Sequence, residues 1–361
     1  MGFYRSLARP VLFGLDAERA HELTLGALGL AGRFGFVKSA LRRGFVAADP
    51  ALETTVAGLK FSNPVGLAAG FDKDCLLSGV LPELGFGFIE LGTVTPRPQP
   101  GNPKPRLFRI REAEAVLNRM GFNNRGAAAA AENLRAAGPC RVPLGVNLGV
   151  NKDTPSEKAH KDYSDSLDAL RGLADYYVVN VSSPNTGGLR LLQSRVNLER
   201  ILTEVRSHNS ERKPVFVKLA PDLEVEHLVE LIPLILEEAQ GLVIANTTIS
   251  REGVPPRWAT EPGGVSGAPL RERSTKLLSE AYLVSGGRIP IIGVGGVFSA
   301  EDAWRKICAG ASLVQVYTGL IYRGPDLVRE INEGLTALLR RNGLKSIGDA
   351  VGRSHPEVVR K

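Results

Sequence analysis

Ile289-Pro-Ile-Ile-Gly-Val-Gly-Gly-Val-Phe-Ser-Ala-Glu-Asp302 contains one unit of the pattern that predicts the fold of this chain. Its apolar run has the continuous character of a parallel strand that is covered on both faces. A helix is expected to follow, because Ser299 is a typical N-cap residue and Glu301 and Asp302 place acidic charge in the first turn. The stretch therefore indicates a strand, a glycine-rich turn and a helix.

The same pattern recurs from about Pro64 onward, with helical segments such as 224–239 and 300–309 filling the gaps. Eight such units in about 280 residues predict an α/β fold, a (β/α)₈ TIM barrel. An open doubly wound sheet is the alternative, but it more often shows G-x-G-x-x-G after an early strand, and that motif is absent. The eight predicted strands are 65–69, 88–92, 144–147, 177–180, 215–218, 242–245, 289–293 and 313–316.

Length and composition fit one barrel with additional segments. The chain has 361 residues, and a barrel of about 250 would leave roughly 110. Hydrophobic content of 43% and charged content of 23% exclude disorder, collagen and coiled coil as the main character. The three cysteines are widely spaced, which predicts no disulfide framework and indicates a reducing compartment.

Three regions are expected: a small N-terminal helical extension over 1–48, the barrel over 49–343 and a basic C-terminal tail over 344–361. Asp16 is expected to cap a helix that begins at Ala17. Residues 54–61 predict a hairpin that turns at Gly58 and closes one end of the barrel. The tail shows no amphipathic period and is expected to be loose.

The net charge of +7 is concentrated at the two ends of the chain. Residues 1–48 hold seven Lys/Arg and three Asp/Glu, and residues 340–361 hold six and two, which leaves 7 − 4 − 4 = −1 for the middle. A nucleic-acid enzyme would place basic charge around its working body, so no nucleic-acid partner is expected. Basic ends beside an apolar helix suit an anionic lipid surface, although a solvated basic surface explains them equally well.

No apolar run approaches the roughly 20 residues that span a bilayer, and no signal peptide is recognisable. We therefore expect a soluble or peripheral membrane protein.

Barrel enzymes carry their chemistry at the carboxyl ends of the strands. In this sequence those ends are rich in amides, hydroxyls and two lysines, and they hold no histidine and no carboxylate pair. Neither a metal site nor a glycosidase pair is expected there. The five histidines fall in predicted helices, loops or the tail, namely His21, His160, His208, His227 and His355.

The amides suit a neutral heterocycle with alternating N–H and C=O groups, because asparagine is both donor and acceptor. Gly293-Val-Gly-Gly296 and Tyr317-Thr-Gly319 follow the seventh and eighth strands, where barrels often bind phosphate. A phosphate site, a planar ring and a cation at Lys218 together predict flavin mononucleotide (FMN). A buried salt-bridge lysine is the alternative interpretation of Lys218.

Several motifs carry a family resemblance: Ala68-Ala-Gly-Phe-Asp-Lys73, Gly92-Thr-Val-Thr-Pro-Arg-Pro-Gln-Pro-Gly-Asn102, Asn118-Arg-Met-Gly-Phe-Asn-Asn124, Asn180-Val-Ser-Ser-Pro-Asn-Thr186, Lys218-Leu-Ala-Pro-Asp222 and Asn246-Thr-Thr248. In content and order they resemble the quinone-dependent (class 2) dihydroorotate dehydrogenases, from about Tyr4 to Arg341. The segment 8–21 resembles the N-terminal extension of that membrane-associated class.

The resemblance implies a serine base, Ser183, which takes a proton from C5 of dihydroorotate while C6 passes hydride to the flavin. Residues implied to line FMN are Ala69, Gly70, Phe71, Asp72, Lys73, Thr93, Asn147, Asn180, Lys218, Gly267, Gly296, Tyr317 and Thr318. Residues implied to hold dihydroorotate or orotate are Lys73, Asn118, Arg119, Met120, Gly121, Phe122, Asn180, Asn185, Asn246 and Thr247.

The resemblance further implies a monomer at the cytoplasmic side of the cell membrane that passes electrons to a membrane quinone through its N-terminal helices. On the residues alone, Ser183 before Pro184 also fits ordinary turn chemistry, and no proton relay for it is visible. Cys75 is expected to pack in a helix after the first strand. Ala245 departs from the family pattern, which usually has threonine there.

Two other functions remain open at this point. Another FMN barrel, such as an RNA dihydrouridine synthase, fits the pI of about 9.4 but predicts a basic barrel mouth and an RNA-binding domain. A non-enzymatic lipid-surface anchor leaves the polar strand ends without a role.

Overall fold

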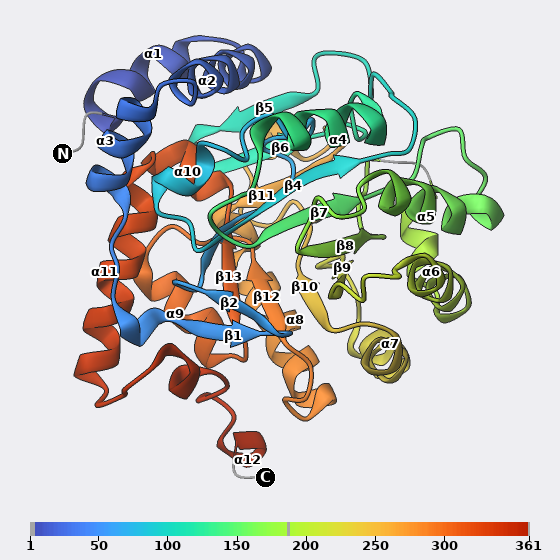
Figure 1. The fold of residues 1–361 in the computed structure, drawn as a ribbon. Helices are drawn as coiled ribbons and strands as arrows, with labels where there is room; N and C mark the ends of the chain where they lie inside the picture. Colours follow the sequence, from blue (N-terminus) through green and yellow to red (C-terminus); the bar gives the residue numbers. More distant parts are fainter. Residues whose placement is uncertain (1–3, 186–187, 360–361) are drawn as a thin grey trace.

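The computed structural model describes residues 4–185 and 188–359. Parts of the predicted segments lie outside the described residues, namely residues 1–3, residues 186–187, which include Thr186, and residues 360–361. Eight parallel strands close into a barrel (Figure 1), which confirms the predicted fold. Each predicted strand run overlaps one of them. The barrel strands are β3 (Val65–Leu67), β4 (Phe88–Val94), β7 (Leu144–Leu148), β8 (Tyr176–Asn180), β9 (Val215–Leu219), β10 (Gly241–Ile244), β12 (Ile291–Val294) and β13 (Leu313–Val316).

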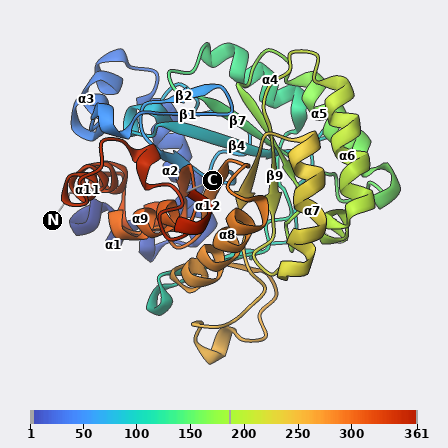
Figure 2. The ribbon, with the colours of Figure 1, turned by 90° about the horizontal axis from the view of Figure 1, so that it is seen from below.

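Helices surround the barrel, and Figure 2 shows this ring from below. Ser299 accepts a hydrogen bond from the Asp302 N–H and begins α9 as predicted. The helices of the ring are α4 (Gly126–Ala137), α5 (Ala159–Ala169), α6 (Arg195–His208), α7 (Val225–Glu238), α8 (Arg271–Ser285), α9 (Ala300–Cys308), α10 (Thr318–Arg323) and α11 (Asp326–Arg341).

The lower end of the barrel interior is filled by aromatic rings that face small residues. A Cβ atom on Gly66 would lie 2.4 Å from the Phe88 ring, and one on Gly145 would lie 2.1 Å from Tyr176. The hairpin of β1 (Thr54–Val56) and β2 (Leu59–Phe61) closes this end, as predicted, and its Phe61 ring packs edge-on against Phe88 at 5.4 Å. This packing excludes ligands from the lower half of the barrel and leaves the upper end for a site.

A second sheet that the sequence analysis did not predict lies over the mouth of the barrel (Figure 1). It consists of β5 (Leu107–Ile110), β6 (Ala115–Asn118) and β11 (Gly264–Gly267), in the antiparallel order β11-β6-β5. It brings Asn118, at the end of β6, over the strand ends.

The N-terminal segment folds into η1 (Tyr4–Ala8), α1 (Arg9–Gly14), α2 (Ala17–Ala31) and α3 (Gly35–Phe45). The predicted cap is present, since the Asp16 carboxylate accepts hydrogen bonds from the N–H groups of Glu18 and Arg19 at 3.0 Å. Glu18 also forms a buried ion pair with Arg106, with an N–O distance of 2.8 Å. Removing one partner of such a pair costs about 3–5 kcal/mol, so α2 is firmly attached to the loop before β5.

The C-terminal tail is not loose, contrary to the expectation. It forms η9 (Ile347–Ala350), begun by a capping box between Ser346 and Asp349, and then α12 (Pro356–Val359). Ile347 and Ala350 are buried, and His355 Nε2 lies 2.7 Å from Ser279 Oγ on α8. The lack of an amphipathic period did not indicate a loose tail, because individual side chains and a helix cap attach this segment to the rest of the fold.

The expectation of a helix around Cys75 is also wrong. Cys75 is buried as expected, but its φ of 58° lies in the left-handed region and no helix follows β3 directly. The Asp72 carboxylate accepts the Leu77 N–H at 2.7 Å and holds this segment as a loop, which leads to the 3-10 turn η3 (Leu81–Leu84). The helix α3 packs on η3, where Arg42 forms a two-fold ion pair with Glu83 at 2.7 Å.

Candidate active site

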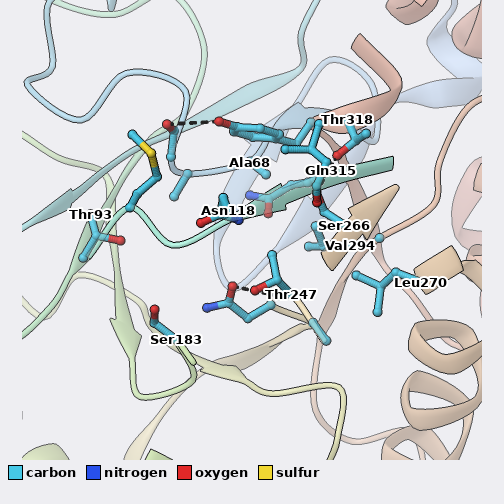
Figure 3. A pocket seen from close by; sticks show the side chains of 18 of the residues that line it. Ala68, Thr93, Asn118, Ser183, Thr247, Ser266, Leu270, Val294, Gln315 and Thr318 are labelled. Carbon is cyan, nitrogen blue, oxygen red and sulfur yellow. Dashed lines mark hydrogen bonds between the residues drawn. The ribbon is translucent and has the colours of Figure 1, made fainter. Parts of the chain in front are cut away.

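The upper end of the barrel opens into a cavity lined by residues from most of its strand ends, from the second sheet and from α2. Figure 3 shows Thr93, Ser183, Thr247 and Gln315 around this common space. The structure thus brings together all but four of the predicted site residues. Those that line the cavity are Ala69, Gly70, Lys73, Thr93, Asn118, Met120, Gly121, Phe122, Asn180, Ser183, Asn185, Lys218, Asn246, Thr247, Gly267, Gly296, Tyr317 and Thr318.

Four predicted residues do not line the cavity. Phe71 packs edge-on against His21 at 5.3 Å, and Asp72 lies buried beneath its loop, where burial raises the pKa of its carboxyl. Arg119 instead forms an ion pair with Glu261, with an N–O distance of 2.5 Å. Asn147 lies below the cavity floor, where it orients residues that do reach the cavity.

A hydrogen-bonded amide network joins the ends of neighbouring strands. Thr93 Oγ1 donates to Asn147 Oδ1 at 2.6 Å, and Asn180 Nδ2 donates to the same oxygen at 2.9 Å. Asn246 Nδ2 in turn donates to Ser182 Oγ at 3.0 Å, and Ser182 Oγ donates to Asn180 Oδ1 at 3.1 Å. These bonds set which faces of the cavity offer N–H donors and which offer oxygen acceptors.

Beneath this network a carboxylate is enclosed in the barrel. Glu90 is 0% exposed, and its two oxygens accept hydrogen bonds from Asn147 Nδ2 at 2.8 Å and Gln315 Nε2 at 2.6 Å. Lys218 Nζ, which belongs to the cavity wall, lies 3.5 Å from Glu90 Oε1. Lys218 is therefore a buried salt-bridge lysine that also lines the cavity, so the alternative interpretation is confirmed and the flavin contact stays a prediction.

Ser183 is nearly buried and faces the cavity (Figure 3). Its Oγ accepts the backbone N–H of Asn185 at 3.2 Å, which is the turn chemistry considered from the sequence. Asn185 Nδ2 donates to Asn118 Oδ1 at 3.1 Å and so links the serine loop to the second sheet. The turn orients the hydroxyl toward the cavity, so the two interpretations of Ser183 are compatible.

The glycines after β12 have positive φ angles and lie close to α8. Gly295 and Gly296 have φ angles of 107° and 71°, which disfavour any other residue. A Cβ on Gly296 would lie 2.4 Å from Cβ of Arg271. The Gly296 carbonyl accepts the Arg271 Nε–H at 3.0 Å, and the Gly295 carbonyl accepts the Ser274 hydroxyl at 3.2 Å. Both donors belong to α8, which thus fixes this turn.

Two ionisable groups meet where α2 covers the cavity. Burial, together with the positive charge of Arg106, lowers the pKa of Lys73 to about 8. Burial beside Lys73 likewise lowers the pKa of His21 to about 3, so this imidazole is neutral at physiological pH. Lys73 is the group at this end of the cavity that changes its charge near neutral pH.

The N-terminal helices expose apolar side chains on the surface that faces away from the barrel. Among the described residues, seven of the 14 large exposed apolar side chains belong to residues 1–48, with Phe36 74% exposed. Within residues 4–185 and 188–359, no helix combines the length and the apolar character needed to cross a membrane. In the same residues no group of three or more His, Cys, Asp or Glu could hold a metal ion.

Comparison with known proteins agrees with this site. The family model for dihydroorotate dehydrogenase matches residues 51–339. A dihydroorotate dehydrogenase (quinone) of Acidithiobacillus ferrooxidans is 49% identical over 357 residues, which cover 96% of this chain and 98% of the relative. This chain belongs to the dihydroorotate dehydrogenase family. The relative's name also confirms the resemblance to the quinone-dependent class.

Further members of the dihydroorotate dehydrogenase family match over nearly the full length. A protein of Myxococcus xanthus with the same name is 49% identical and covers 97% of both chains. The crystal structure of DHODH from Eimeria tenella in complex with ferulenol has a TM-score of 0.83 at 37% identity, covering 96% of this chain and 99% of that one. These matches favour an enzyme of this family over an RNA-modifying barrel or a lipid anchor.

Dihydroorotate dehydrogenases are flavin-dependent oxidoreductases, and the cavity of this chain fits a flavin. Gln315 Oε1 and Thr247 Oγ1 are buried, and neither has a hydrogen-bond partner among the described residues. Both residues line the cavity, and such groups need a partner because an unsatisfied buried acceptor costs about 1–3 kcal/mol. A heterocycle with N–H groups supplies one, so the donor and acceptor set suits a flavin and a second planar ring.

Sequence reasoning missed several residues of the cavity wall. Gln315 was detectable, because a polar residue inside an apolar barrel strand needs a reason. His21 was not, since its place depends on how α2 docks. Leu107, Val116, Ser266, Leu270 and Val297 were likewise missed. Gly295 and Gly319, like Ala68 and Val294, belong to motifs already quoted from the sequence, and Ala245 had been left out because it departs from the family pattern.

Proposed function

We propose that this enzyme oxidises (S)-dihydroorotate to orotate in pyrimidine biosynthesis, with FMN as its cofactor and a membrane quinone as the electron acceptor. The observation that carries the proposal is the convergence of Lys73, Ser183 and Lys218 on one cavity. A base, a cation for the substrate and a cation for the flavin thus share one enclosed space.

The chain binds the two rings from different sides. Gly295, Gly296 and the start of α10 would hold the FMN phosphate, and Lys218 would supply a cation to the flavin ring. Asn118, Asn185 and Asn246 bind the substrate ring, since each places an amide at the cavity. Lys73 pairs with the substrate carboxylate, a charge-assisted contact that orients the ring.

Ser183 Oγ takes the proton from C5 of dihydroorotate. Bound FMN supplies the hydride acceptor for C6. The amides that face the substrate carbonyl stabilise the negative charge that develops there as the proton leaves. Among the described residues no side chain accepts a hydrogen bond from the Ser183 hydroxyl, so we propose that water takes the proton onward.

The N-terminal helices serve as the quinone-access segment. His21 on α2 belongs to the cavity wall, and the same segment exposes apolar side chains outward. We propose that a quinone passes along these apolar side chains from a lipid surface to the flavin. We propose that the enzyme is a monomer bound peripherally at the cytoplasmic side of the membrane, where anionic lipids attract its basic N-terminal segment.

The proposal is tested with Ser183→Ala in anaerobic stopped-flow experiments. Purified enzyme should be yellow, with one FMN per chain. In the variant, flavin reduction by dihydroorotate should slow by at least 100-fold, because general-base catalysis typically contributes 10²–10⁴-fold. Reoxidation of the reduced enzyme by quinone should be nearly unchanged.

Ser183→Cys is the matched variant, because a thiolate is also a proton acceptor. Its reduction rate should rise with pH up to a thiol pKa of about 8.5, whereas Ser183→Ala should show no such rise. A colourless protein that ignores added FMN would remove the flavin assignment. Parent-like reduction of Ser183→Ala would show that another group is the base.

A further inference from the structure

Glu90 has no role in the reaction described so far, although it lies directly beneath the site. It lies on β4 with two-residue spacing from Phe88, so its side chain points into the barrel as the Phe88 ring does. It is completely buried, and nothing of it reaches the cavity wall. A buried carboxylate is costly unless it is paired and hydrogen-bonded, so its presence calls for a function or a compensating set of contacts.

Among the described residues, the polar contacts of Glu90 all lead to residues at or just below the cavity wall. Its oxygens accept hydrogen bonds from Asn147 at 2.8 Å and Gln315 at 2.6 Å, and Lys218 Nζ lies 3.5 Å away. Lys218 is itself only 5% exposed, and Glu90 is the one acidic side chain within 4 Å of it among the described residues. The carboxylate thus lies behind the cation that faces the cavity.

This arrangement has an electrostatic consequence. In a site with little water, a charge acts on its neighbours much more strongly than in solvent. Lys218 alone would favour the reduced flavin, which carries additional negative charge at its pyrimidine edge. Glu90 opposes this effect, because a negative charge directly behind the cation reduces the field that the ring experiences.

We infer that Glu90 is a charge-balancing residue that lowers the reduction potential of the bound flavin by offsetting Lys218. The inference rests on the proposed FMN site. A lower potential makes the reduced flavin a better donor to quinone, while hydride transfer from dihydroorotate becomes less favourable. Glu90 therefore shifts driving force from the reduction of the flavin by dihydroorotate to its reoxidation by quinone.

The test is a double-mutant cycle of Glu90→Gln, Lys218→Met and both together, read as the midpoint potential of bound FMN. Glu90→Gln should shift the potential positive, and Lys218→Met should shift it negative. In the double variant neither position carries a charge, so its midpoint potential should lie between those of the two single variants. The opposite signs of the two potential shifts matter, because damage to packing at two neighbouring residues would not shift the potential in opposite directions.

Glu90→Gln leaves Lys218 buried and unpaired, and this variant can fail to fold. The step from Lys218→Met to the double variant then measures the same effect, and it should again be positive. Equal potentials across either step would overturn the inference. So would loss of FMN from all three folded variants, since the pair would then serve binding. A parent enzyme without FMN would instead refute the proposed function.

Discussion

Lys73 is the residue whose environment most directly predicts a pH dependence. Burial and the charge of Arg106 lower its pKa to about 8, because both disfavour the protonated amine. The proposed contact with the substrate carboxylate needs that amine charged. Affinity for dihydroorotate and orotate should therefore be full below pH 8 and fall above it, by at most about tenfold per pH unit.

The measurement is the dissociation constant of orotate from the flavin absorbance change between pH 6.5 and 9.5. Lys73→Arg keeps its charge throughout this range and should give a flat profile. Lys73→Met should also be flat, but with weaker binding at pH 7. Parallel profiles for the parent and Lys73→Arg would assign the titration to a different group.

At the level of elements, the barrel was predictable because its strands carry a repeated local signal. A strand covered on both faces must be apolar throughout, and each run such as 215–218 shows this in the sequence alone. The second sheet was not predictable, since Gly264 of β11 pairs with Asn118 from a distant segment. The site followed the same division: strand-end residues were found, whereas the place of His21 depends on how α2 docks. Glu90 was detectable in the same way as Gln315, as a polar residue inside an apolar strand run.

The N-terminal helices form the element with a separable role in the proposed function. Deleting residues 1–48 removes His21 from the cavity wall and the exposed apolar side chains, but leaves Ser183, Lys218 and the barrel. We expect loss of activity with long-chain quinone and of detergent or vesicle association. Reduction of the flavin by dihydroorotate should persist.

A small water-soluble electron acceptor provides the control for this deletion, because it does not need the apolar route. The truncated enzyme should retain turnover with it. Glu18→Gln is a milder companion variant that loosens the attachment of α2 to Arg106 without removing the helix. Normal kinetics of the truncated enzyme with a long-chain quinone would show that the acceptor reaches the flavin elsewhere.

The whole molecule separates its two basic ends in space. The helices α1 and α2 lie at one end of the molecule and α12 lies at the other (Figure 1). Both end segments carry a net charge of +4 in the sequence, but within residues 4–185 and 188–359 only the N-terminal one exposes large apolar side chains around that charge. Since peripheral binding combines buried apolar area with attraction to anionic lipids, one end alone should face the membrane.

Two matched double variants test whether the N-terminal end alone faces the membrane. Arg33→Gln with Arg43→Gln removes two exposed charges from the N-terminal segment, and Lys345→Gln with Arg353→Gln removes two from the tail. Each basic residue near an anionic surface contributes about 1 kcal/mol, so the first pair should weaken binding to phosphatidylserine-containing vesicles by roughly 10- to 30-fold at low salt. The second pair should leave it unchanged, and neutral vesicles should not distinguish them. Equal losses in the two variants would mean that lipid attraction follows net charge and not the orientation proposed here.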